Sequence, residues 1–132
     1  MALFLLQIFL KGVIPMQEIL KTNKGDIFWA ELPESGRHIQ TGRRPVLIVG
    51  NEKANRYSDI VTVIPITGRV EKADVIPTHV CLNTAFRCGS VLLPEQIRTI
   101  SKDQLLGSCI YRLTEDEQKT VDRALSEQLG FI

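Results

Sequence analysis

The sequence predicts a mainly β domain, a small barrel or strongly curled sheet, with one amphipathic helix at its C-terminus. Its 132 residues suit a single domain. A composition with 44% hydrophobic and 23% charged residues is that of a globular chain able to bury a core. Short runs rich in Ile, Val and aromatic residues recur between Gly, Pro and Asn, which is typical of the strands of a small barrel.

The strands are expected wherever such a run is bounded by turn residues. The last of them alternates Cys109, Tyr111 and Leu113 with more exposed positions, a pattern that indicates a half-buried strand. The expected strands cover residues 26–32, 45–49, 60–66, 77–82, 90–93 and 108–113.

Two helices are expected from their start signals. In each, a hydroxyl residue that can cap the helix is followed three residues later by Gln or Glu, and this pair satisfies two backbone amides reciprocally. The helices would cover residues 101–107 and 114–130, each ending at a glycine. The buried stripe of the longer helix would be Val121, Leu125 and Leu129.

The first twenty residues form an apolar extension ahead of the domain proper, residues 21–132. The apolar run at residues 3–10 is shorter than the roughly 20 residues that span a bilayer. The first charge, Lys11, follows this run, whereas a secretion signal places positive charge before it. Met16 offers a second start, so we expect residues 1–20 to be a misplaced start in a cytoplasmic protein without a membrane partner.

Charge and metal-binding residues narrow the function classes. A net charge of +1 excludes an overall basic nucleic-acid coat, so a polyanion site must be local. Residues 36–72 carry seven basic and three acidic side chains, and the last twenty residues carry a net charge of −3. The three cysteines form no C-x-x-C pair and there are two histidines, so neither a structural zinc nor a cofactor is expected.

Five short motifs, taken together in their order along the chain, are more informative than any one of them alone. They are residues 24–30 (KGDIFWA), 42–49 (GRRPVLIV), 63–67 (VIPIT), 77–80 (PTHV) and 94–100 (PEQIRTI). Together they resemble the MazF/PemK (Kid) family, the toxin endoribonucleases of type II toxin–antitoxin systems. The resemblance runs from about residue 24 to the C-terminus.

This resemblance implies an SH3-like β-barrel with appended helices, assembled as a homodimer. It also implies sequence-specific, metal-independent cleavage of single-stranded messenger RNA, started by attack of a ribose 2′-hydroxyl. The implied partner is a cognate antitoxin whose extended acidic segment covers the RNA groove. Two alternatives stay open: a non-catalytic toxin that binds a protein such as gyrase, as CcdB-like toxins do, and a degenerate barrel that binds RNA without cutting it.

The resemblance also assigns the site. Arg44 matches the catalytic arginine of the family and Thr67 its catalytic threonine. Two roles are open for Arg98: a contact with RNA, or a structural ion pair with Glu95. The expected RNA-binding residues are Arg37, Gln40, Arg43, Arg69, Gln96 and Arg98.

The loop before Arg44 departs from the family, because residues 37–43 contain no carboxylate where many relatives carry a glutamate. The general base is therefore unassigned, and His38 is a candidate because an imidazole exchanges protons near neutral pH. We expect His79 to be structural. Phe28 and Trp29 are expected in the core rather than as platforms for RNA bases.

Overall fold

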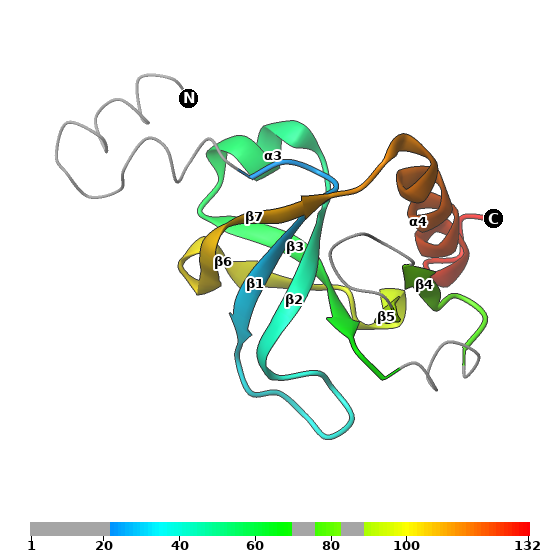
Figure 1. Cartoon of the computed structure of the whole chain (residues 1–132), viewed down its shortest axis with the longest axis horizontal. Helices are drawn as coiled ribbons and strands as arrows, with labels where there is room; N and C mark the ends of the chain where they lie inside the picture. The colour runs from blue at the N-terminus through cyan, green and yellow to red at the C-terminus, as the bar shows by residue number, and fades with distance from the viewer. Residues whose placement is uncertain (1–21, 70–75, 83–88) are drawn as a thin grey trace, which may run out of the picture.

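The computed structural model describes residues 22–69, 76–82 and 89–132 (Figure 1). The apolar extension at residues 1–20 lies outside this part of the chain. Strands dominate the described residues, and the one long helix follows the last strand. The elements are β1 (Asp26–Leu32), β2 (Gly42–Val49), α3 (Glu52–Tyr57), β3 (Ile60–Thr67), β4 (Val80–Leu82), β5 (Ser90–Leu92), the 3-10 turn η2 (Pro94–Gln96), β6 (Arg98–Ser101), the 3-10 turn η3 (Lys102–Gln104), β7 (Leu105–Arg112) and α4 (Glu115–Gln128).

The described strands form one seven-stranded antiparallel sheet in the order β4-β5-β3-β2-β1-β7, and β6 also pairs with β3. β3 changes partner along its length: residues 60–63 pair with β6, whereas Ile66 and Thr67 pair with β5. Because of this change of partner, β3 is connected through β5 to β4 at one edge of the sheet. Among the described strands, neither β4 nor β6 pairs with β7. The mainly β fold with a C-terminal helix is confirmed, but the closed SH3-like barrel is not.

Both faces of the long central strands are buried. Alternate residues of β1, β2 and β3 enter two separate clusters, which explains why their sequences are continuous apolar runs. The first cluster lies against α4, β4 and β5, and comprises Ile27, Leu47, Val49, Ile64, Ile66, Val80, Leu82, Leu92, Leu113 and Val121. The second lies toward β6 and β7, and comprises Phe28, Ala30, Leu32, Val46, Ile48, Val61, Val63 and Ile100.

The prediction of a helix over residues 101–107 is wrong. The Ser101–Gln104 capping box is present, but it encloses only the 3-10 turn η3, and β7 begins at Leu105. Gly107 has a φ of +74° inside that strand rather than after a helix. Two short elements, β6 and α3, were not predicted because four and six residues carry too little periodicity.

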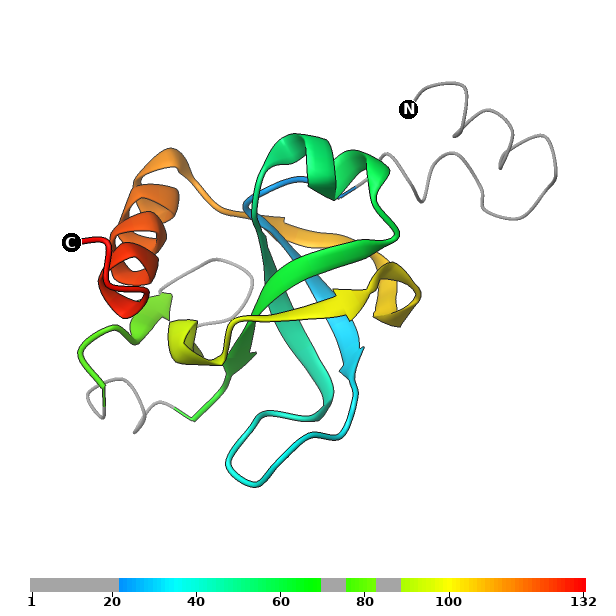
Figure 2. The same cartoon turned by 180° about the vertical axis from the view of Figure 1, so that it is seen from behind.

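The C-terminal helix α4 forms as predicted and packs on one end of the sheet (Figure 2). Thr114 Oγ1 accepts a hydrogen bond from the Glu117 amide at 3.2 Å, and Glu117 Oε1 accepts one from the Thr114 amide at 2.9 Å. Val121 is fully buried and Leu125 packs against the same cluster, but Leu129 lies past the helix and is 47% exposed. No helix in the described residues is long and apolar enough to cross a membrane.

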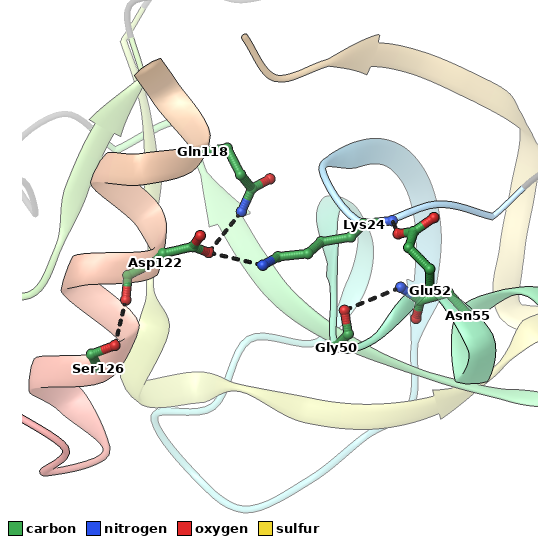
Figure 3. Close-up of polar contacts among 7 residues, drawn as sticks. All are labelled: Lys24, Gly50, Glu52, Asn55, Gln118, Asp122 and Ser126. Carbon is green, nitrogen blue, oxygen red and sulfur yellow. Dashed lines mark hydrogen bonds and ion pairs between the residues drawn. The ribbon is translucent and has the colours of Figure 1, made fainter. Parts of the chain in front are cut away.

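The segment before β1 ties α3 to α4 (Figure 3). The Lys24 amide donates to Glu52 Oε1 of α3 at 2.6 Å, and Lys24 Nζ lies 3.2 Å from Asp122 Oδ1 of α4. Asp122 is held in turn by Gln118 Nε2 at 2.9 Å, and its carbonyl accepts from Ser126 Oγ. One lysine of the KGD motif therefore bridges two helices that are far apart in the sequence.

The next two motif residues are also structural. Gly25 has a φ of +92°, a backbone conformation that is strained for any residue with a Cβ, so glycine is favoured there. Asp26 is fully buried; its carboxylate accepts from the Asn23 amide at 3.1 Å and from Arg112 Nε at 2.8 Å. In this chain the residues of the KGD motif therefore shape the start of the fold.

Candidate functional site

A small cavity opens where β2 begins and β3 ends. Its volume is about 140 Å³. Both strand ends belong to motifs on which the resemblance rests, GRRPVLIV and VIPIT. The cavity is lined by Trp29, Arg43, Arg44, Pro45, Ile66, Gly68 and Ser90. The fold thus brings Arg44 to the neighbours of Thr67, although Thr67 itself does not line the cavity.

Prolines account for this opening. The pairing between β2 and β3 ends at Val46 and Pro65, and proline has no N–H with which to continue a ladder. The next residue of β2 toward the cavity, Pro45, is a second proline. Continuing the same register by two residues would place Arg44 opposite Thr67. The strands therefore separate at the two residues that the sequence assigns to catalysis.

Arg44 is half-buried at the wall of this cavity. It pairs with Ala30 of β1, and its Nε donates to the Thr41 carbonyl at 2.8 Å. That hydrogen bond fixes the guanidinium through one nitrogen, Nε, and the two terminal nitrogens remain as donors for a ligand. Because a guanidinium fork can hold two oxygens of a phosphoryl group, the geometry suits an anion held in two places.

Thr67 is less accessible than its predicted role requires. It is 1% exposed, and its Oγ1 accepts a hydrogen bond from the Arg69 amide at 3.3 Å. The hydroxyl keeps its own proton as a donor. Gly68 and Arg69 follow on the surface, so the turn after Thr67 is exposed while Thr67 is not.

The loop between β1 and β2 is fastened from η2 and β6. Gln96 Oε1 accepts from the Gln40 amide at 2.7 Å, and Gln96 Nε2 donates to the His38 carbonyl at 3.2 Å. Arg98 Nη1 donates, over longer distances, to the carbonyls of Pro33 and Gln40. Gln96 and Arg98, which were expected to bind RNA, thus hold the backbone of the loop that precedes Arg44.

Two further loop residues differ in exposure. Gln40 is 9% exposed, and its Oε1 is buried without a hydrogen-bond partner in the described residues. His38 is exposed and has a φ of +71°, the one non-glycine residue of the described chain in the left-handed region. It does not line the cavity. The structure therefore anchors the His38 carbonyl and leaves its side chain in the exposed loop.

The remaining predicted arginines surround the site unevenly. Arg43 lines the cavity, and its Nε lies 3.7 Å from Glu31 Oε2 in an exposed pair worth little stability. Arg37 and Arg69 are exposed, in the loop and after β3. Lys53 and Arg56 belong to α3, at the opposite end of the sheet from the loop (Figures 1 and 2). The basic stretch 36–72 is therefore not one patch in space.

Trp29 was expected in the core, and the structure separates it from Phe28. Phe28 is 3% exposed in the second cluster, as predicted, whereas Trp29 is half-buried and lines the cavity. The strand alternation contained a signal: Glu31, two residues along β1, shares the face of Trp29 and is exposed. Ser90, which is buried at the cavity, had no comparable signal.

Other titratable groups have structural roles. His79 is buried as expected, and its Nε2 lies 2.6 Å from Glu95 Oε2, so Glu95 pairs with His79 rather than with Arg98. Burial, followed by the nearby Asp26 carboxylate, raises the pKa of the Cys109 thiol, which disfavours the thiolate. Among the described residues, no group of three or more His, Cys, Asp or Glu side chains could hold a metal ion.

Comparison with known proteins decides the family. The family model described as "PemK-like, MazF-like toxin of type II toxin-antitoxin system" matches residues 23–129. The chain belongs to the PemK/MazF toxin family. A curated relative, Endoribonuclease MazF of Staphylococcus saprophyticus, is 40% identical over 110 residues, which are 81% of this chain and 90% of that protein. The resemblance drawn from the sequence is confirmed, and the chain is a member of a family of toxin endoribonucleases.

Solved structures of PemK/MazF toxins share the fold. MazF from Deinococcus radiodurans has a TM-score of 0.70 at 23% identity, covering 82% of this chain and 96% of that one. A mycobacterial endoribonuclease in complex with its cognate antitoxin has a TM-score of 0.63 at 24% identity, covering 83% and 94%. At these identities the likeness supports the fold of the MazF-like domain.

Proposed function

We propose that this toxin is a sequence-specific endoribonuclease that cleaves single-stranded messenger RNA at the cavity between β2 and β3. The observation that carries the proposal is the position of Arg44: in a chain of this family, its guanidinium lies at an opening between strand ends, and within the described residues it is tethered through Nε. A volume of about 140 Å³ is below the about 300–1,000 Å³ of typical ligand sites and suits one phosphoryl group.

The reaction is transesterification within the RNA. The ribose 2′-oxygen attacks the adjacent phosphorus, the bond from phosphorus to the 5′-oxygen breaks, and the products are a cyclic phosphate and a 5′-hydroxyl. The 2′-hydroxyl proton passes to a base, and the leaving oxygen takes up a proton. Arg44 would stabilise the extra negative charge of the phosphorane with two donors, and no cofactor or metal ion is needed for that role.

Thr67 and His38 have weaker support. Because Thr67 is buried, its hydroxyl can reach a phosphoryl oxygen only after the residues that cover it move. His38 is proposed as the base because it is the titratable group of residues 37–43 apart from the arginines, yet its side chain lies outside the cavity lining. Arg37, Arg43 and Arg69 would hold flanking phosphates. Gln40, Gln96 and Arg98 would act on RNA mainly through the shape of the loop.

The proposed assembly is a cytoplasmic homodimer inhibited by an antitoxin. Two structural relatives, from mycobacteria and Deinococcus radiodurans, are described as complexes with an antitoxin. We infer that an extended acidic antitoxin segment covers Arg43 and Arg44, so that its affinity falls as salt rises. A CcdB-like toxin that binds gyrase without cutting RNA is not favoured, since the curated relative is named an endoribonuclease.

The test is cleavage of a mixed single-stranded RNA pool, with sequencing of the 5′ ends and chemical analysis of both end groups. Arg44→Ala should lower turnover by about 10²- to 10³-fold, and Arg44→Lys should recover little of it. Arg56→Ala is the matched control, because Arg56 is an exposed arginine on α3 at the other end of the sheet. Cleavage should persist in EDTA. Products with a 5′-phosphate, or full activity of Arg44→Ala, would contradict the mechanism.

A further inference from the structure

A second cavity adjoins the first on the other side of Trp29. Its volume is about 470 Å³, within the range of small-molecule sites. It is lined by Trp29, Arg43, Leu106 and Gly107. Trp29 and Arg43 line both cavities, so the two cavities share a wall formed by β1 and β2.

A wide bulge in β7 creates this second cavity. Ile27 pairs with Tyr111 but Trp29 pairs with Leu106, so one residue of β1, Phe28, faces residues 107–110 of β7. Gly107 begins the bulge with a φ of +74°, a conformation that glycine adopts without strain. The bulge lies at the level of Trp29, and Trp29 is half-buried beside it.

The lining has the chemistry of a base-binding site. The Trp29 indole lies on β1 between Pro45 of β2 and Leu106 of β7, its directly paired neighbours. These neighbours and Gly107 are apolar, and Arg43, which is exposed, is the charged member of the lining. An aromatic face beside apolar groups and one arginine is the arrangement by which proteins bind an unstacked nucleobase and its phosphate.

We propose that the cavity of Trp29, Leu106 and Gly107 binds the nucleobase next to the scissile phosphate, stacked on the indole, while Arg43 holds the phosphate between the two cavities. This inference rests on the proposed cleavage at Arg44, because it uses the shared wall of the two cavities to order base and phosphate. It assigns Trp29 to substrate binding, in place of the core role predicted from the sequence.

Trp29 provides its own probe, since it is the one tryptophan in the sequence. The ligand is a short RNA containing the cleavage motif, with a 2′-deoxy nucleotide at the cleaved position so that it binds uncut. Its addition should quench the tryptophan fluorescence. The same RNA with an abasic site at the stacked position should bind more weakly, by about 5- to 150-fold, and quench less. Equal quenching by RNAs abasic at either flanking position would overturn the proposal.

Cleavage kinetics give the second measurement. Trp29→Leu keeps apolar volume but has no large π face. It should bind intact RNA more weakly than the wild type does, and its affinity should fall little further when the RNA is abasic at the stacked position. Trp29→Phe should restore most of the difference. Phe131→Ala is the control, because Phe131 is an aromatic residue that is 76% exposed at the C-terminus. Circular dichroism of each variant shows whether it is folded, and Trp29→Phe keeps the test valid if Trp29→Leu is not.

The outcomes separate this inference from the proposed function. If the wild-type chain cuts RNA, and Trp29→Leu discriminates intact from abasic RNA as the wild type does, the base-stacking inference fails alone. If the wild type cuts no RNA, the proposed function fails. If Trp29→Leu weakens only dimerisation or antitoxin binding, the occupant of this cavity is a protein and the inference is wrong.

Discussion

The contact between Gln96 and the β1–β2 loop gives the sharpest prediction about the site. Gln96→Met keeps the length of the side chain but removes both the acceptor for the Gln40 amide and the donor to the His38 carbonyl. Each such hydrogen bond contributes about 0.5–1.5 kcal/mol net, so the loop should lose about 1–3 kcal/mol of stabilisation. The longer contacts from Arg98 remain, and they limit the loss to the loop itself.

This loss is measurable without RNA. Amide hydrogen exchange of Gln40 should be faster in Gln96→Met by about 5- to 150-fold, the factor that corresponds to 1–3 kcal/mol. Gln96→Glu keeps an acceptor for Gln40 and should give a smaller change. Gln104→Met is the matched control, because Gln104 Oε1 accepts from the Ser101 amide at 3.0 Å in a different part of the chain.

RNA cleavage should depend on how well the β1–β2 loop is ordered. If the ordered loop binds RNA equally in the ground and transition states, Gln96→Met should raise KM with little change in kcat. An unchanged exchange rate for Gln40 would refute the positioning role. In that case any rise in KM would have to come from a direct contact between Gln96 and RNA.

Three further predictions concern other parts of the chain. Asp26→Ala should lower the free energy of unfolding by about 3 kcal/mol in denaturant titrations, the low end for a broken buried pair because the Arg112 side chain is 66% exposed; a change below 1 kcal/mol would show that Asp26 is not needed for folding. A chain starting at Met16 should fold, dimerise and cleave RNA like the full chain, and failure would show that residues 1–15 are needed for folding, dimerisation or cleavage. His38→Asn, chosen because Asn tolerates the φ of +71°, should lower cleavage by about 10²- to 10⁴-fold. Cleavage at the wild-type rate would exclude His38 as the base.

Local sequence patterns predicted most of the fold. The strands at residues 26–32 and 60–66 and the capped helix at 114–130 were predictable because periodicity, turn residues and caps act within a few residues of one another. The helix expected at 101–107 failed for the same reason. Its capping box is real, but a three-residue turn satisfies that box as well as a longer helix does.

The candidate site was predictable only in part. The order of the motifs identified the family and Arg44, and the prolines beside Arg44 were visible in the sequence. The role of Gln96 was not, because its partners Gln40 and His38 lie 56 and 58 positions earlier in the chain. Trp29 was misassigned to the core because its exposure depends on the bulge in β7, a strand about eighty residues later whose register with β1 shifts.

The sequence alone determined most of the strands, the C-terminal helix and the family of the chain, since these follow from the order of nearby residues. The tertiary structure decided which residues meet: Arg44 near the turn after Thr67, Gln96 on the loop backbone, and Trp29 between two cavities. Which residues lie close together depends on strand register and on where the sheet opens at Pro45 and Pro65. Such long-range geometry is the sum of many weak pairings, and no single stretch of sequence carries it.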